Sequence, residues 1–222
     1  MPVVKHGVNG DLRQKGKIAT LACGYGGSSG ALISMGALQM GLHEEELPEI
    51  IDSWREANPK IVQYWWDTEK AAMTAYKTGE RQEVGKIAFE FYSGTLWMVL
   101  PSGRRLAYLK PRQQPNRFGR MSLTYEGVGQ NHKWSRQETY SGRLVENATQ
   151  AIARDILAEA MDRISAEGLN IVAHVHDEVI IEAPKDQYTV DEVCKLMSEN
   201  PAWCKGLPLA AAGYKGCLLY TS

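Results

Sequence analysis

Residues 171–181 read IVAHVHDEVII, an apolar and β-branched run with a polar centre. Val and Ile favour strands, and a short polar break between two such runs is typical of a hairpin. We therefore expect two short strands over residues 170–182, joined by a tight charged turn. An amphipathic helical pattern precedes them at about residues 142–167. The combination of a long helix with an antiparallel hairpin predicts the α+β class.

The chain upstream of this region begins with helical patterns and then changes to strand patterns. Helices are expected over residues 10–23, 30–40, 44–56 and 59–78, and a last one near the C-terminus over residues 190–198. Trp65 and Trp66 fall at helical spacing among apolar residues, so we expect both in the core. Residues 95–109 contain a Pro-Ser-Gly-Arg turn and predict a β-hairpin, with a further strand over 120–125. The predicted architecture is a helical region with this β-hairpin insertion, followed by part of an antiparallel sheet.

The composition is that of a soluble globular protein: 222 residues, 44% hydrophobic and 23% charged. It excludes a collagen, a coiled-coil rod and a disordered tail. The four cysteines, Cys23, Cys194, Cys204 and Cys217, include no Cys-x-x-Cys pair, which argues against a disulfide framework or a zinc knuckle. No apolar run approaches the ~20 residues that span a bilayer, and no signal-peptide pattern follows Met1. We expect a protein of the reducing cytoplasm.

The formal net charge is −1, so any interaction with nucleic acid must depend on local clusters. Two basic clusters and one acidic block are present. They consist of Lys5, Arg13, Lys15 and Lys17, of Arg104, Arg105, Lys110, Arg112, Arg117 and Arg120, and of Glu44, Glu45, Glu46, Glu49 and Asp52. The simplest interpretation of each run, taken alone, is a solvated surface.

One face of the first predicted helix carries Arg13, Lys17 and Leu21 at spacing i, i+4, i+8, and Tyr25-Gly26 follows where the helix breaks. Guanidinium and ammonium groups hold phosphates, while Leu21 and Tyr25 can cover a base or a sugar. This face therefore suits a nucleoside triphosphate. The alternative is an ordinary amphipathic helix whose Lys and Arg side chains extend into solvent.

The predicted helix over 142–167 carries a polar stripe formed by Arg143, Asn147, Gln150 and Arg154. Amide side chains can bind acceptors in the minor groove of DNA, and arginine can bind either those acceptors or phosphates. The stripe could therefore follow a duplex without sequence specificity. A plain solvent-exposed face is the alternative, although such faces usually favour Lys and Glu.

Asp177 and Glu178 lie at the tip of the predicted hairpin, where two buried and unpaired acids would be costly. Mg²⁺ would remove this cost, because it binds through one or two carboxylates together with substrate phosphates. Two alternatives stay open. His174 and His176 lie on one strand face and could bind zinc for hydrolysis, or the tip is a polar turn without a ligand.

These motifs occur in an order that resembles family A DNA polymerases, the bacterial DNA polymerase I class. The resemblance rests on Arg13-x-x-x-Lys17 with Tyr25-Gly26, on the helix with Arg143, Asn147 and Gln150, and on His176-Asp177-Glu178. Residues 7–10 (GVNG) and 15–19 (KGKIA) are similar to phage-encoded members. Single-subunit RNA polymerases share the first motif, but Glu178 and the Asn147 helix favour DNA synthesis. The resemblance covers nearly all of the chain.

The resemblance implies a hand-shaped polymerase. Residues 1–139 would form the fingers, with a nucleotide-binding helix at 10–26 and the hairpin insertion. Residues 140–216 would form part of the palm, with a DNA-contacting helix at 142–167 and a metal-binding hairpin at 170–182. Residues 217–222 resemble translated adapter sequence and are expected to be a non-native tail.

The resemblance also implies roles for individual residues. Arg13 and Lys17 would hold the triphosphate, with Lys17 also catalytic, and Leu21, Tyr25 and Gly26 would shape the nucleoside pocket. Arg143, Asn147, Gln150 and His176 would contact primer-template DNA, while Asp177 and Glu178 would bind metal and support catalysis. Deoxynucleotides would be added to a primer 3′-hydroxyl by two-metal phosphoryl transfer with Mg²⁺, releasing pyrophosphate. The implied protein is a monomer in the cytoplasm of a bacterium or of a phage host.

Three features depart from the family. Leu21 stands where many members have an aromatic residue, and the spacing from Asn147 to Gln150 is one residue shorter than in bacterial members. The motif that would precede Arg13 and supply the second catalytic aspartate is missing. Because two Mg²⁺ ions ~4 Å apart need more carboxylates than one hairpin provides, we expect a fragment that is inactive alone. The alternatives are a noncatalytic DNA-binding module and a zinc hydrolase that uses His174 and His176.

Overall fold

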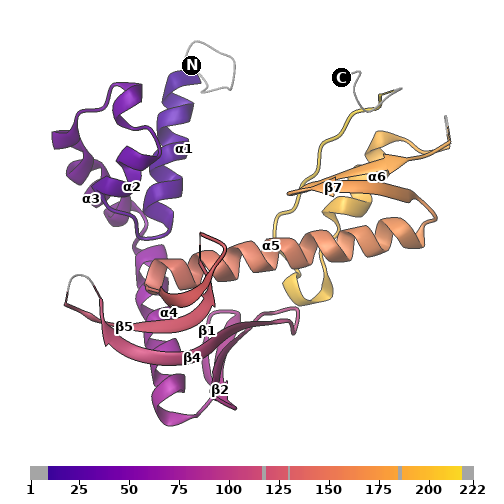
Figure 1. Cartoon of the computed structure of the whole chain (residues 1–222). Coiled ribbons are helices and arrows are strands. Elements are labelled where there is room, and N and C mark those ends of the chain that lie inside the picture. Colours follow the sequence, from indigo (N-terminus) through magenta and orange to yellow (C-terminus); the bar gives the residue numbers. More distant parts are fainter. Residues whose placement is uncertain (1–9, 117–118, 130, 185–186, 217–222) are drawn as a thin grey trace. The chain divides into compact units, whose positions relative to one another are not determined.

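The computed structural model of the chain describes residues 10–116, 119–129, 131–184 and 187–216 (Figure 1). It divides into two compact units, Met1–Ala148 and Thr149–Ser222. Helices and antiparallel strands both contribute, which confirms the predicted α+β class. The expected non-native tail at 217–222 lies outside the described residues, as do Lys5 and Arg117.

The first unit begins with a set of helices. They are α1 (Gly10–Gly24), α2 (Ser29–Ser34), η1 (Leu38–Met40), η2 (Glu44–Glu46), α3 (Leu47–Ala57) and α4 (Pro59–Thr78). Pro48 and Pro59 stand in the first turns of α3 and α4, where no helical hydrogen bond is lost. Gly79 ends α4 with a φ of 74°, a left-handed conformation that glycine adopts without strain. The helices expected over 30–40 and 44–56 each divide into an α-helix and a 3-10 turn.

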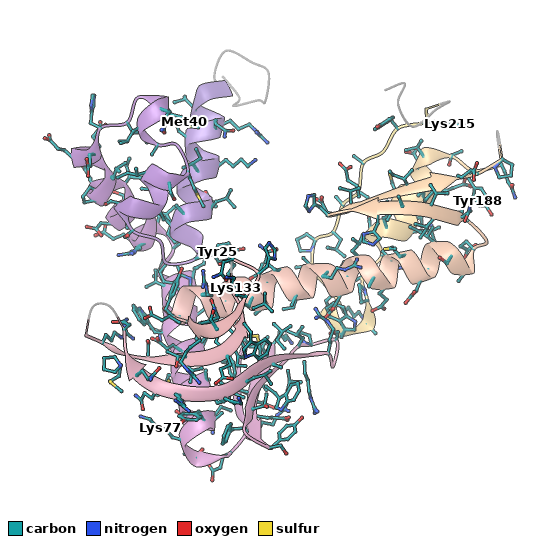
Figure 2. The ribbon with its side chains drawn as sticks, viewed as in Figure 1. Tyr25, Met40, Lys77, Lys133, Tyr188 and Lys215 are labelled. Atoms are coloured by element: carbon teal, nitrogen blue, oxygen red, sulfur yellow. The ribbon has the colours of Figure 1, made fainter. Side chains whose placement is uncertain are left out.

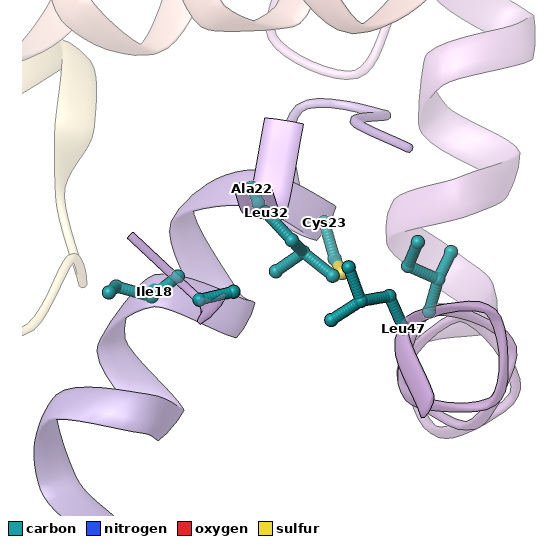
Figure 3. Close-up of a cluster of buried hydrophobic side chains, with 7 residues drawn as sticks. Ile18, Ala22, Cys23, Leu32 and Leu47 are labelled. Atoms are coloured by element: carbon teal, nitrogen blue, oxygen red, sulfur yellow. The ribbon is translucent and has the colours of Figure 1, made fainter. Parts of the chain in front are cut away.

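These helices enclose a small apolar core (Figure 3). Its buried members are Ile18, Ala22, Cys23, Leu32, Ala37, Leu47 and Ile51. Because the three residues from α1 recur at i, i+4, i+5, they occupy one side of that helix. The opposite side of α1 is left to solvent.

Six antiparallel strands follow and form one sheet in the order β1-β2-β3-β4-β5-β6. They are β1 (Gln82–Val84), β2 (Ile87–Tyr92), β3 (Thr95–Val99), β4 (Arg105–Pro115), β5 (Met121–Val128) and β6 (Trp134–Glu138). The hairpin predicted at 95–109 is present as β3 and β4, and the strand predicted at 120–125 as β5. The insertion is nevertheless larger than a hairpin, because β1, β2, β5 and β6 extend it to a six-stranded sheet.

Helix α4 packs against one face of this sheet. Phe89, Leu96 and Met98 are fully buried on that face, and Tyr76 of α4 meets Phe91 of β2 edge-on at a ring-centroid distance of 5.3 Å. An apolar core of this kind supplies most of the stability of a sheet with one open face.

The two adjacent tryptophans of α4 have different environments. Trp65 is 2% exposed, so its predicted place in the core is confirmed. Trp66 is 44% exposed, and its prediction as a core residue was wrong. One residue turns the side chain by about 100° around the helix, which carries Trp66 off the buried face. Its ring instead lies beneath the Arg120 guanidinium, 4.7 Å from ring centroid to Cζ.

The second unit contains most of α5 (Ser141–Ala166), whose first turns belong to the first unit. Strands β7 (Asn170–Val175) and β8 (Glu178–Glu182) form the predicted hairpin, and α6 (Val190–Ser198) and η3 (Ala202–Cys204) follow. Arg163 of α5 donates hydrogen bonds to the carbonyl oxygens of Leu196 at 3.1 Å and Glu199 at 2.8 Å. The Trp203 indole donates to the Glu159 carboxylate at 2.8 Å. These bonds fasten α6 and η3 to α5.

Within the described part of the chain, no helix is both long enough and apolar enough to cross a membrane.

The helical core predicts a difference between two leucines of the first unit. Leu32 is 1% exposed and Leu38 is 38% exposed. Leu32→Ala should lower the free energy of unfolding by about 2–5 kcal/mol, because it removes buried methyl groups and leaves a cavity. Leu38→Ala, the matched control, should cost well under half as much. Urea unfolding followed by circular dichroism measures both, and equal losses would contradict this core.

Candidate functional site

The solvent-exposed side of α1 presents the residues that the sequence suggested for phosphate binding. Arg13 and Lys17 are both exposed, and among the described side chains neither forms an ion pair. Leu21 is 43% exposed, although Ala22 beside it is buried. Leu21 is therefore not a core residue. It lies exposed on α1 one turn beyond Lys17 and two turns beyond Arg13, so a ligand with a charged and an apolar part could contact this face of the helix.

The turn that follows α1 is held by hydrogen bonds to its backbone. The Trp65 indole nitrogen donates to the Gly24 carbonyl at 2.9 Å, and the Arg55 guanidinium donates to the Gly27 carbonyl at 3.3 Å. The amide of Gly27 donates to the Ala22 carbonyl at 2.9 Å. Gly26 lies between these anchors with a φ of 74°, which favours glycine at this position. The backbone of Tyr25 (Figure 2) is thereby fixed at the end of α1.

The first turn of α5 approaches this turn closely. A Cβ atom at Gly142 would collide with the carbonyl oxygen of Tyr25, so only glycine fits. Gly26 lies on the other side of the same contact, where its own Cβ position is 3.7 Å from the Gly142 Cα. Tyr25 and Gly26 therefore lie next to the start of α5. Arg143 is the residue that follows Gly142 in this first turn. This contact could not be foreseen from the sequence, because a glycine at a helix start does not show what it faces.

Asn147 has a partner within the protein. Its amide nitrogen donates to the Tyr108 hydroxyl at 3.0 Å, which links α5 to β4. Tyr108 is 2% exposed and lies edge-on to Tyr125 at 5.1 Å. Burial raises the pKa of the Tyr108 phenol, so the hydroxyl stays protonated at neutral pH. Further along α5, Gln150 and Arg154 are exposed. Tyr108 was not among the sequence candidates.

The tip of the β7–β8 hairpin is a two-residue turn formed by His176 and Asp177. His176 has a φ of 53°, a left-handed conformation that is uncommon for residues other than glycine. Asp177 and Glu178 are both exposed. Their expected burial, with its cost offset by a cation, was therefore wrong. Two exposed carboxylates at a turn are instead open to a ligand from solvent.

The carboxylate pair fits part of a magnesium site. Mg²⁺ takes oxygen ligands and is held by one or two carboxylates plus phosphates, and Asp177 with Glu178 supplies that number. The described residues contain no group of three or more His, Cys, Asp or Glu side chains that could hold a metal. His174 and His176 therefore do not meet a third ligand there, whereas zinc sites use three or four protein ligands.

The candidate residues fall into two groups. The first unit contains Arg13, Lys17, Leu21, Tyr25, Gly26, Arg143 and Asn147. The second unit contains Gln150, His176, Asp177 and Glu178. Within the first unit, the Tyr25 turn and the start of α5 meet. The anchoring residues Trp65, Arg55 and Gly142 were missed by sequence reasoning.

Comparison with known proteins supports the resemblance. The chain is 51% identical over 207 residues to a protein named DNA polymerase from Bacillus phage SP02. The alignment covers 91% of this chain and 32% of the phage protein, so the chain spans about a third of that relative's length. No sequence-family profile matches the chain, and no solved structure matches it. The predicted similarity to a phage DNA polymerase is confirmed.

The surroundings of Gly142 and Gly16 predict that alanine at these two positions changes the stability of the protein in opposite directions. Gly142→Ala should destabilise the protein by about 1–3 kcal/mol, because the new methyl group forces α5 and the Tyr25 turn apart. Gly16→Ala in α1 meets nothing within 4 Å and should stabilise it by about 0.5–1 kcal/mol, since alanine favours helix. Thermal unfolding measures both. A Gly142→Ala protein as stable as the parent would show that the close contact does not exist.

Proposed function

We propose that this chain is a segment of a family A, template-dependent DNA polymerase of the phage type. The observation that carries the proposal is the 51% identity to a phage DNA polymerase across a chain that contains all three ordered motifs. Residues 1–139 would act as the fingers and residues 140–216 as part of the palm. The whole enzyme would work on primer-template DNA and deoxynucleoside triphosphates, as a monomer in the host bacterium.

The exposed face of α1 is the proposed nucleotide site. Arg13 offers a planar guanidinium that can bind two phosphate oxygens at once, and Lys17 offers a compact charge one turn further on. Leu21, exposed beside them, would contact the sugar or base. The hydrogen-bonded turn after α1 would keep Tyr25 in place, so that less conformational entropy is lost when a nucleotide binds.

Helix α5 is the proposed DNA-contacting element. Arg143 and Gln150 would bind phosphate or minor-groove atoms of the duplex. Asn147 uses its amide nitrogen on Tyr108, so its side-chain oxygen is the atom we assign to DNA. That oxygen can accept from the exocyclic amine of guanine, the donor in the minor groove. His176, in the turn beside Asp177, would lie near the primer end.

Asp177 and Glu178 are the proposed metal ligands. Mg²⁺, when bound, would lower the pKa of the primer hydroxyl and stabilise charge on the triphosphate. Asp177 and Glu178 would hold the metal ion through their exposed carboxylates. Arg13 and Lys17 would neutralise the phosphate oxygens as pyrophosphate leaves, which is the electrostatic part of catalysis in phosphoryl transfer.

The hairpin also supports the proposal that this chain alone is inactive. Two carboxylates are fewer than two metal ions require. Among the described residues, β7 and β8 pair only with each other, and Val172 and Val175 are 53% and 51% exposed. A sheet of two strands is marginal in water. We propose that further strands and a further aspartate come from the rest of the polymerase.

Primer extension tests the proposed function. A chimera in which this chain replaces the matching segment of the SP02 polymerase should extend a primed template with Mg²⁺, whereas the 222-residue chain should not. In the chimera, Asp177→Asn should abolish extension, because the amide that replaces the carboxylate carries no negative charge to bind Mg²⁺. Asp162→Asn, an exposed acid on α5, is the matched control and should leave extension intact.

Other results would contradict the proposal. A folded but inactive chimera would favour a noncatalytic DNA-binding module, and zinc bound in a one-to-one ratio and lost in His174→Ala would favour a hydrolase. Extension by the purified chain alone, abolished by Asp177→Asn, would refute the inactive-fragment proposal.

Leu21 provides a separate prediction. In the chimera, Leu21→Phe should change the rate of incorporation or the discrimination against dideoxynucleotides, because a ring would pack more rigidly on the sugar than an exposed aliphatic chain does. Single-turnover kinetics with deoxy and dideoxy substrates measures both effects. Leu12→Phe, at the 52%-exposed leucine near the start of α1, is the control. If both variants behave like the parent, Leu21 does not contact the nucleotide.

A further inference from the structure

The six-stranded sheet has a second face, away from α4, to which the proposed polymerase site assigns no role. Residues opposite one another in antiparallel strands share a face. Phe91 pairs with Leu96, and Leu96 with Tyr108, on the α4 side. The neighbouring row, Tyr92, Thr95, Leu109, Glu126 and Arg136, therefore lies on the other face. We call this the outer face.

The sheet is the basic part of the chain. Residues 82–138 contain nine Lys or Arg and four Glu, while the whole chain has a net charge of −1. Residues 91–125 contain six Lys or Arg and no acid. A basic element in a chain of nearly neutral charge is the electrostatic footprint expected for a polyanion.

Ion pairs hold the cations of the outer face in place. Glu126 accepts from Lys110 at 2.8 Å and from Arg136 at 3.1 Å. Glu90 likewise pairs with Arg105 at 3.5 Å and with Arg81. Because Glu126 is bound by two cations, its cluster keeps a net positive charge. Around Glu90 the charges balance, since Arg81 also pairs with Glu83 at 3.3 Å.

Exposed aromatic rings accompany these cations. Tyr92 is 43% exposed and stacks on Trp97 with ring centroids 5.7 Å apart. The Arg105 guanidinium lies 6.0 Å from the Tyr92 ring centroid. Trp134, 58% exposed, pairs across β5 and β6 with Val128, which is 63% exposed. Rings and cations thus occur together at both ends of the Lys110–Glu126–Arg136 cluster.

We propose that the outer face binds single-stranded nucleic acid. The cations would contact phosphates, and Tyr92 and Trp134 would stack on unpaired bases, a combination that tolerates any sequence. A duplex would use the cations alone, because its bases are already stacked. The inference goes beyond the proposed polymerase activity, since it requires no nucleotide, no metal and neither Asp177 nor Lys17.

Fluorescence anisotropy with a labelled oligo(dT) and the full 222-residue chain in EDTA tests the proposal. We expect saturable binding that weakens with salt and is tighter than binding to a duplex of the same length. Trp134→Leu should weaken oligo(dT) binding roughly fivefold or more, because it removes one stacking platform. Trp66→Leu, the exposed tryptophan on α4, should change it less than twofold.

A second pair of variants tests the charges. Lys110→Gln with Arg112→Gln should reduce the slope of log affinity against log salt by about 1.4, given about 0.7 per phosphate contact on a single strand. Lys70→Gln with Lys77→Gln, two exposed lysines of α4, should leave the slope unchanged. Circular dichroism checks folding, and Trp134→Leu still decides the question if the double variant unfolds.

Three results would overturn the proposal: no binding of oligo(dT), equal losses in the α4 controls, or displacement of oligo(dT) by poly-glutamate at equal charge concentration. The last would identify an acidic peptide site instead. Oligo(dT) binding by the chain together with an inactive chimera would leave this proposal standing and refute only the polymerase function. An active chimera, together with no oligo(dT) binding by the chain, would refute only the proposal for the outer face.

Discussion

The backbone turn at Tyr25 and Gly26 is the constraint on which the first unit depends. Trp65 and Arg55 hold its carbonyl oxygens from α4 and α3, and Gly142 lets the start of α5 approach within contact of the Tyr25 carbonyl. Four helices therefore share one fixed point. The exposed residues Arg13, Lys17 and Leu21 lie further back along α1, so they belong to a helix whose C-terminal end is fixed.

Much of this arrangement was predictable from local patterns. The long helices α1, α4 and α5 and the β7–β8 hairpin follow directly from apolar periodicity and from the break at His176-Asp177. The six-stranded sheet was underestimated, because β6 reads WSRQE and lacks an apolar alternation. Its place in the sheet comes from pairing with β5, and such long-range pairing leaves no local mark.

The candidate site was predictable only in part, for a similar reason. Cations at helical spacing reveal a face of α1, but Trp65, Arg55 and Gly142 act across elements that are distant in sequence. Asn147 shows the opposite limit: its position on α5 was foreseen, yet its bond to Tyr108 depends on the sheet. The exposure of Asp177 likewise depends on what surrounds the hairpin, and only the fold determines that.

The proposed polymerase role rests on the binding of a deoxynucleoside triphosphate to the exposed face of α1. Photocrosslinking with 8-azido-dATP and Mg²⁺, followed by peptide mapping, tests this binding. We predict an adduct on the peptide that contains Leu21 and Tyr25, prevented by excess dATP and strongly reduced by Lys17→Gln, whereas Lys60→Gln on α4 has no effect. An adduct confined to other peptides, or one insensitive to Lys17→Gln, would show that the nucleotide does not bind to this face of α1.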